Sequence, residues 1–202
     1  MSDKRQLDPT ILREYDIRGI VGDGFNADEF RVIGRGFGSV VIENAGSEKI
    51  PTVAVGFDGR LSSPELANAL SDGLTAAGVD VIKIERGPTP MLYFAMHEFA
   101  ADGGMMITGS HNPPDYNGIK MVLDGHSFFG EEIQALGQRI AEGNFSEGSG
   151  RVKNAHFQRG ISNGCWKISS PAKTSALPGI PAMALPARSF RNWSSNCPGI
   201  IF

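Results

Sequence analysis

The feature that most constrains the fold is an alternation of short apolar runs with amphipathic stretches, joined by short links. The run Thr52–Phe57 is nearly all apolar, as expected of a strand buried on both faces of a mostly parallel sheet. Residues 62–65, SSPE, predict a capped helix start with Pro at the first helical position, and the helix runs to Gly78. Residues 79–84 supply the next strand, so the order is that of an α/β domain.

The same pattern continues along the first three quarters of the chain. An extended opening covers residues 14–21, and the spacing of apolar residues predicts further helices and strands. The expected helices are 27–43, 90–99 and 131–141, and the expected strands are 103–107 and 119–122.

Composition divides the chain in two. Residues 1–150 contain all 22 acidic residues and carry a net charge of −10, whereas residues 151–202 contain no acidic residue and carry +7. The stretch 143–150, GNFSEGSG, resembles a linker. A domain boundary is therefore expected near residue 150, with an irregular, disordered tail over 151–202.

Several classes of function are excluded. The basic residues of the tail are spread out rather than clustered, which argues against nucleic-acid binding. Cys165 and Cys197 are too few for a zinc site, and nothing indicates a disulfide. The start of the chain lacks the apolar run of a signal peptide, and no stretch is long enough to span a membrane. We expect a cytoplasmic protein without nucleic-acid, membrane or protein partners.

The segment 108–120, TGSHNPPDYNGIK, follows an expected strand, and ligands of open α/β sheets gather where loops leave the carboxyl ends of strands. Ser110 is a weak nucleophile unless a neighbour activates it, and His111 adjoins it as a possible acid or base. Gly109 lets the backbone approach a phosphate, and Lys120 brings a positive charge. From these residues alone, Ser110 and His111 could equally be an ordinary turn pair.

The whole string resembles the active-serine loop of the α-D-phosphohexomutase family, as found in bacterial phosphomannomutase/phosphoglucomutase. Three further segments support the resemblance in the expected order: 13–19, REYDIRG; 55–62, VGFDGRLS; and 87–90, GPTP. It covers residues 10–150 and corresponds to the first of the family's four domains, a three-layer α/β/α domain with a mixed, mostly parallel sheet. The family moves a phosphoryl group between C1 and C6 of a hexose phosphate, through a phosphoserine and a hexose 1,6-bisphosphate.

The resemblance implies roles for five residues. Ser110 would carry the phosphoryl group, and its phosphate would ligate Mg²⁺. His111 and Lys120 would contact the transferring phosphate or assist proton movement, while Tyr15 and Arg18 would line the substrate site. Structural interpretations stay open: Arg18 with Asp16 as an ion pair, Tyr15 in the core, and Asp58 with Arg60 holding a turn. The histidines at positions 97, 126 and 156 match no family motif and are expected on the surface.

The motifs by which the family binds Mg²⁺, recognises the sugar and binds the second phosphate do not occur in the 202 residues, so the isolated chain is expected to be inactive, or nearly so, as a full mutase. If the codons of residues 160–168 and 181–187 are read in a shifted frame, they permit amino-acid strings similar to those of the family, which suggests a frameshift near residues 154–159.

Two alternative functions stay open, namely a phosphoglucosamine mutase and a noncatalytic phosphate-binding fragment. A serine hydrolase requires a Gly-x-Ser-x-Gly elbow, which segment 108–120 lacks, so this class of enzyme is not favoured.

Overall fold

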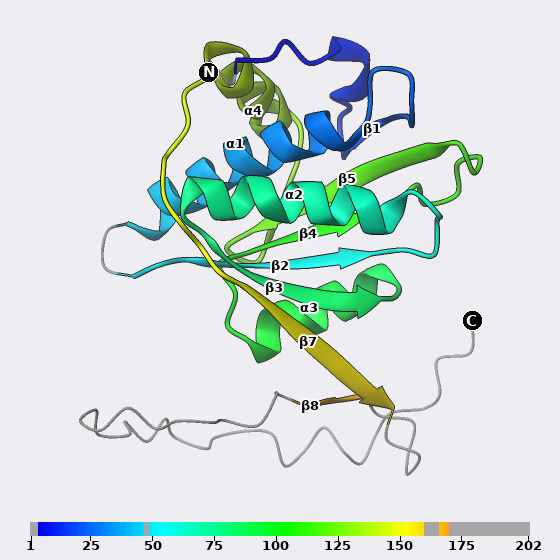
Figure 1. The fold of residues 1–202 in the computed structure, drawn as a ribbon, viewed down its shortest axis with the longest axis vertical. Coiled ribbons are helices and arrows are strands. Elements are labelled where there is room, and N and C mark those ends of the chain that lie inside the picture. The colour runs from blue at the N-terminus through cyan, green and yellow to red at the C-terminus, as the bar shows by residue number, and fades with distance from the viewer. Residues whose placement is uncertain (1–3, 47–48, 160–165, 170–202) are drawn as a thin grey trace. The chain divides into compact units, whose positions relative to one another are not determined.

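A mixed sheet of eight strands forms the middle layer of the structure, which is a computed structural model describing residues 4–46, 49–159 and 166–169 (Figure 1). The strand order is β1-β5-β4-β2-β3-β7-β8, and β6 pairs with β5. The bounds are β1 Ile17–Ile20, β2 Thr52–Phe57, β3 Asp80–Arg86, β4 Gly103–Ile107, β5 Tyr116–Leu123, β6 His126–Phe128, β7 Val152–Arg159 and β8 Trp166–Ser169.

Parallel pairing is confined to the middle of the sheet. β2 pairs in parallel with β3 and β4, and β3 does so with β7, whereas β1, β6 and β8 join by antiparallel pairs. β5 is antiparallel to β4 because the segment between them holds no crossover helix, so the chain turns straight back. The expected mixed sheet is confirmed, with the parallel pairing limited to β4, β2, β3 and β7.

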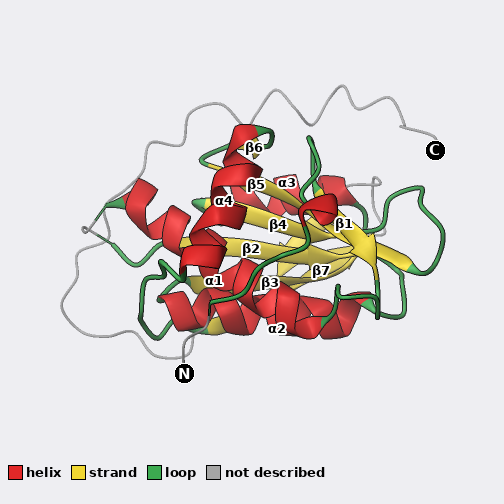
Figure 2. Cartoon of the chain, turned by 90° about the horizontal axis from the view of Figure 1, so that it is seen from above, coloured by secondary structure: helices red, strands yellow, loops and turns green. Residues whose placement is uncertain are grey.

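Helices cover both faces, which confirms the three-layer α/β/α fold. α1, α2 and α4 lie over one face and α3 lies over the other (Figures 1 and 2). Each face has its own apolar cluster: Phe30, Phe37 and Leu70 belong to the larger one, and Leu92 and Met106 to the smaller. The helices are α1 Ala27–Ala45, α2 Ser63–Ala77, α3 Thr89–Glu98 and α4 Glu131–Glu142, preceded by a short 3₁₀ helix, Pro9–Ile11.

The two long helices approach each other at glycines. A Cβ atom on Gly73 of α2 would lie 1.9 Å from the carbonyl oxygen of Arg31 in α1. On the other side, a Cβ on Gly34 of α1 would lie 2.3 Å from the carbonyl oxygen of Leu70 in α2. Backbone therefore packs directly on backbone, and no larger residue fits at either position.

The helix starts differ from the sequence prediction at one point. Asn26 and Glu29 form a capping box at the start of α1: the side chain of each accepts a hydrogen bond from the backbone N–H of the other. The segment 62–65 was expected to give α2 a capped start. Pro64 lies at the start of the helix as expected, but the N-cap residue Ser62 makes no side-chain capping bond with α2. Instead the Ser62 hydroxyl accepts a hydrogen bond from the Asn117 side chain of β5, which ties the start of α2 to the neighbouring strand.

The sheet continues past residue 150, where the irregular tail was expected to begin. β7 extends the parallel edge, with Val81 opposite Val152 and Ile84 opposite Ala155. Residues 160–165 and 170–202, which hold most of the expected tail after the suspected frameshift point, lie outside the described residues. Within the described ranges, no helix is long and apolar enough to cross a membrane.

Candidate active site

Ser110 lies in the loop between β4 and β5, at the carboxyl end of β4. It is exposed and has a φ of 53°, in the left-handed region that residues with a side chain rarely adopt. Its N–H donates to the Thr108 hydroxyl at 2.9 Å, and its own hydroxyl lies 3.3 Å from Nδ1 of His111. The loop therefore presents the serine hydroxyl to solvent with an imidazole beside it.

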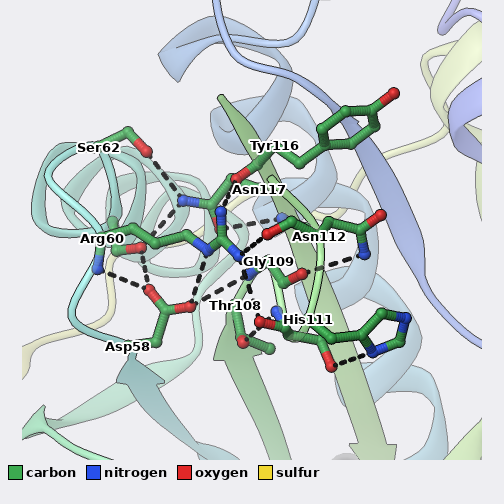
Figure 3. Close-up of polar contacts among 12 residues, drawn as sticks. Asp58, Arg60, Ser62, Thr108, Gly109, His111, Asn112, Tyr116 and Asn117 are labelled. Atoms are coloured by element: carbon green, nitrogen blue, oxygen red, sulfur yellow. Dashed lines mark hydrogen bonds and ion pairs between the residues drawn. The ribbon is translucent and has the colours of Figure 1, made fainter. Parts of the chain in front are cut away.

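The side chain of Arg60, from the segment after β2, extends toward this loop (Figure 3). Its guanidinium donates hydrogen bonds to four loop carbonyls, and its side chain is 14% exposed. The loop backbone rests so closely on it that a Cβ on Gly109 would lie 2.2 Å from Cζ of Arg60. The accepting carbonyls belong to Ser110 (3.2 Å), Asn112 (2.7 Å), Pro113 and Tyr116 (2.9 Å).

Asp58 completes this arrangement. Oδ2 of its carboxylate accepts the N–H of Gly109 at 3.1 Å and lies 3.3 Å from Nε of Arg60. Oδ1 accepts the Ser63 hydroxyl at 2.7 Å, so one carboxylate joins the loop to the start of α2. Burial raises the pKa of Asp58, but the hydrogen bonds that it accepts outweigh burial and hold that pKa below its ordinary value. The group is therefore anionic at neutral pH, as a partner of Arg60 should be.

A second cluster lies where β1 pairs with β5. Oδ2 of Asp16 is shared by two cations: Nη2 of Arg18 contacts it directly, and Nζ of Lys120 lies 3.4 Å away. The Asp16 and Arg18 side chains are only 11% and 7% exposed, whereas Lys120 is 36% exposed. Nε of Arg18 is buried and has no hydrogen-bond partner within the described part of the chain. This cluster carries one net positive charge and one unused donor.

Tyr15 projects beside this cluster. It is 72% exposed, and its ring stacks on Phe129 with centroids 6.2 Å apart. Both rings line a cavity of about 350 Å³ that Lys120 and Tyr93 also border. The open interpretation of Tyr15 as a core residue is therefore wrong, and its ring forms part of an aromatic wall next to a cation.

The predicted site residues thus form two groups. Ser110 and His111 lie together on the loop, whereas Tyr15, Arg18 and Lys120 lie around β1 and β5. The contribution of the Asp58–Arg60 pair was left open between a turn and a site. The Arg18–Asp16 ion pair, which was also left open, is present, whereas the contact of Asp16 with Lys120 was not foreseen. The position of Asp58 and Arg60 in the chain could have assigned them to the site, because residues 58–60 directly follow β2, whose carboxyl end adjoins that of β4.

The remaining histidines stand apart from both groups. His97 and His126 are exposed, as expected, and the His156 side chain lies outside the described residues.

Comparison with known proteins agrees with this architecture. The family model described as phosphoglucomutase/phosphomannomutase, alpha/beta/alpha domain I, matches residues 9–147. The phosphomannomutase/phosphoglucomutase of Pseudomonas aeruginosa is 46% identical over 147 residues, covering 73% of this chain and 31% of that protein. The phosphoglucomutase of Neisseria gonorrhoeae is 48% identical over 126 residues, covering 62% of this chain and 26% of that protein.

A solved structure of a phosphoglucomutase/phosphomannomutase family protein from Burkholderia thailandensis superimposes with a TM-score of 0.68 at 46% identity. It covers 73% of this chain and 33% of its own. The chain thus spans about a third of the length of the relatives that it matches. On the family model, the sequence identity and the fold together, the chain belongs to the phosphoglucomutase/phosphomannomutase family.

Proposed function

We propose that residues 1–150 form the phosphoserine-bearing domain of a phosphomannomutase/phosphoglucomutase, with Ser110 as the phosphoryl carrier. The observation that carries the proposal is the conformation of Ser110. An exposed serine is held in a left-handed conformation at the carboxyl end of β4, with His111 at 3.3 Å. Such strained residues persist only where the surroundings fix them, and they cluster at functional sites.

The carrier step needs a donor, an acceptor and one proton transfer. The bond between phosphorus and Oγ of phosphorylated Ser110 breaks while a bond forms from phosphorus to a free hydroxyl of the hexose phosphate. The proton of that hydroxyl leaves, and Ser110 regains one on Oγ. His111 lies at hydrogen-bond distance from Oγ, so its imidazole can hold this proton in transit. The bisphosphosugar then turns round and returns its other phosphate to Ser110.

Charge is the second requirement, because the transferring oxygens gain negative charge in the transition state. Lys120 and Arg18 supply two cations, of which Asp16 neutralises one. Lys120 lines the cavity, so we propose that its ammonium contacts a substrate phosphate there. We propose that Tyr15 and Arg18 contribute to binding the substrate, with the exposed ring of Tyr15 forming a binding surface beside Lys120.

The described residues do not by themselves make a magnesium site. They contain no group of three or more His, Cys, Asp or Glu side chains that could hold a metal ion. Mg²⁺ prefers several oxygen ligands in octahedral geometry, and a phosphate on Ser110 would supply only part of that set. Bound through that phosphate, Mg²⁺ would polarise the transferring phosphoryl group, while Ser110 carries the group and His111 and Lys120 assist.

Incubation with glucose 1,6-bisphosphate followed by intact-mass measurement tests the proposal. The chain is expected to gain one phosphoryl group, located on Ser110 by peptide mapping, and Ser110→Ala should gain none. Ser149→Ala is the matched control, because Ser149 is exposed and does not line this cavity. A wild-type chain that takes up no phosphoryl group would favour a noncatalytic fragment, and label that persists in Ser110→Ala would refute the assignment of the carrier.

A further inference from the structure

The conformation of Ser110 needs an explanation, because a left-handed φ costs a residue with a side chain about 1 kcal/mol. Apolar packing of the loop does not explain how this conformation is maintained. Ser110 and His111 are exposed, and so are Pro113, Pro114 and Asp115 in the rest of the loop. The loop must therefore be held by polar contacts.

Those contacts fix the peptide planes on both sides of Ser110. In the preceding plane, the Ser110 N–H donates to the Thr108 hydroxyl and the Gly109 carbonyl accepts the N–H of Asn112. In the following plane, the Ser110 carbonyl accepts from Nη2 of Arg60 at 3.2 Å. Since φ and ψ of a residue are set by the orientation of its two flanking planes, these bonds together determine the conformation of Ser110.

Arg60 contributes the largest share. Its guanidinium bonds to four carbonyls spread over residues 110–116, so the loop is folded around one side chain. A guanidinium has five N–H donors in a rigid fork, whereas a lysine ammonium has three donors at a single point. Asp58 neutralises this partly buried cation and accepts the N–H of Gly109 at 3.1 Å. A smaller donor could not reach the same set of acceptors.

We propose that Arg60 is a positioning residue, which with Asp58 holds Ser110 in the conformation required of a phosphoryl carrier. The effect of Arg60 on phosphoryl transfer rests on the proposed function, whereas its effect on the conformation of the loop does not. Arg60 acts through the backbone of the loop, because its donors are directed at the four carbonyls and at Asp58 rather than at the serine hydroxyl.

Hydrogen exchange measured by NMR on the full chain tests the effect on the loop. Arg60→Ala is expected to lower the protection of the Asn112 and Tyr116 amides about tenfold or more, because hydrogen bonds to a charged group are lost. Protection in β2 and β4 should stay unchanged. Arg86→Ala, which removes an exposed arginine at the end of β3, is the control and should change neither.

Chemical rescue separates positioning from a general loss of structure. A low, non-denaturing concentration of guanidinium should restore loop protection in Arg60→Ala, where it can occupy the vacated space, and not in Arg60→Lys, where the lysine side chain fills that space. The rate of phosphoryl uptake from glucose 1,6-bisphosphate should fall about 100-fold in Arg60→Ala and recover with guanidinium.

Two outcomes would overturn the inference. One is unchanged exchange of the loop amides in Arg60→Ala; the other is an equal loss of protection in β2 and β4, which would mean that Arg60 stabilises the fold as a whole. If Arg60→Ala does not fold, Arg60→Lys carries the exchange test, and wild-type protection in that variant would likewise count against the inference. Failure of the wild-type chain to take up phosphate concerns the proposed function alone, since exchange is measured without substrate.

Discussion

Replacing Gly73 with alanine is expected to lower the free energy of unfolding by about 3 kcal/mol, at the upper end of the usual cost of overpacking. The added methyl group would lie 1.9 Å from the carbonyl oxygen of Arg31, a backbone atom that can move only if α1 shifts. In an exposed helix the same change would be favourable by about 1 kcal/mol, so the sign of the effect is diagnostic.

Urea denaturation of the two proteins measures this difference. Gly59→Ala is the matched control, because a Cβ there meets nothing within 4 Å and the glycine has no positive φ. An alanine at position 73 that leaves stability unchanged or raises it would contradict the backbone-to-backbone packing of α1 on α2.

Replacing Asp16 with asparagine is expected to cost about 3 kcal/mol or more of stability, because it leaves a buried cation without its counter-charge. The Arg18 side chain is 7% exposed, and Asp16 is its ion-pair partner within the described residues. Lys120 loses the same partner, so its ammonium should become more mobile at the edge of the cavity.

The comparison for this experiment is Asp28→Asn, which breaks exposed ion pairs with Arg31 and Arg5 and should cost less than about 1 kcal/mol. Thermal unfolding of both variants against wild type gives the answer. Equal stability of the two variants would show that the Asp16 cluster is solvated. Arg18 and Lys120 would then not be held in fixed positions at the site.

The sequence was sufficient to predict the elements that its periodicity marks. The apolar run of β2 and the leucines of α2 define their elements locally, so both were placed correctly to within two residues. The position of Ser110 at a strand end followed from the same pattern. β7 was not foreseen, because its hydrogen bonds to β3 join residues that lie about 70 apart in the chain, which no local pattern reports.

The contacts around the site were less accessible to sequence reasoning for the same physical reason. Arg60 and the carbonyls that it binds are separated by at least 50 residues, and backbone carbonyls leave no trace in residue type. The side-chain cap expected from residues 62–65 does not form, and the Ser62 hydroxyl instead accepts a hydrogen bond from Asn117, a distant residue of β5. Local propensity gave way there to a tertiary hydrogen bond.

A chimera tests the central claim most directly, namely that this chain supplies a working carrier domain of the family. In it, residues 9–147 replace the matching segment of the Pseudomonas aeruginosa phosphomannomutase/phosphoglucomutase. We expect the folded chimera to convert glucose 1-phosphate to glucose 6-phosphate, and the same chimera with Ser110→Ala to show no turnover above background. A folded chimera without activity, or a Ser110→Ala chimera as active as its parent, would contradict the claim.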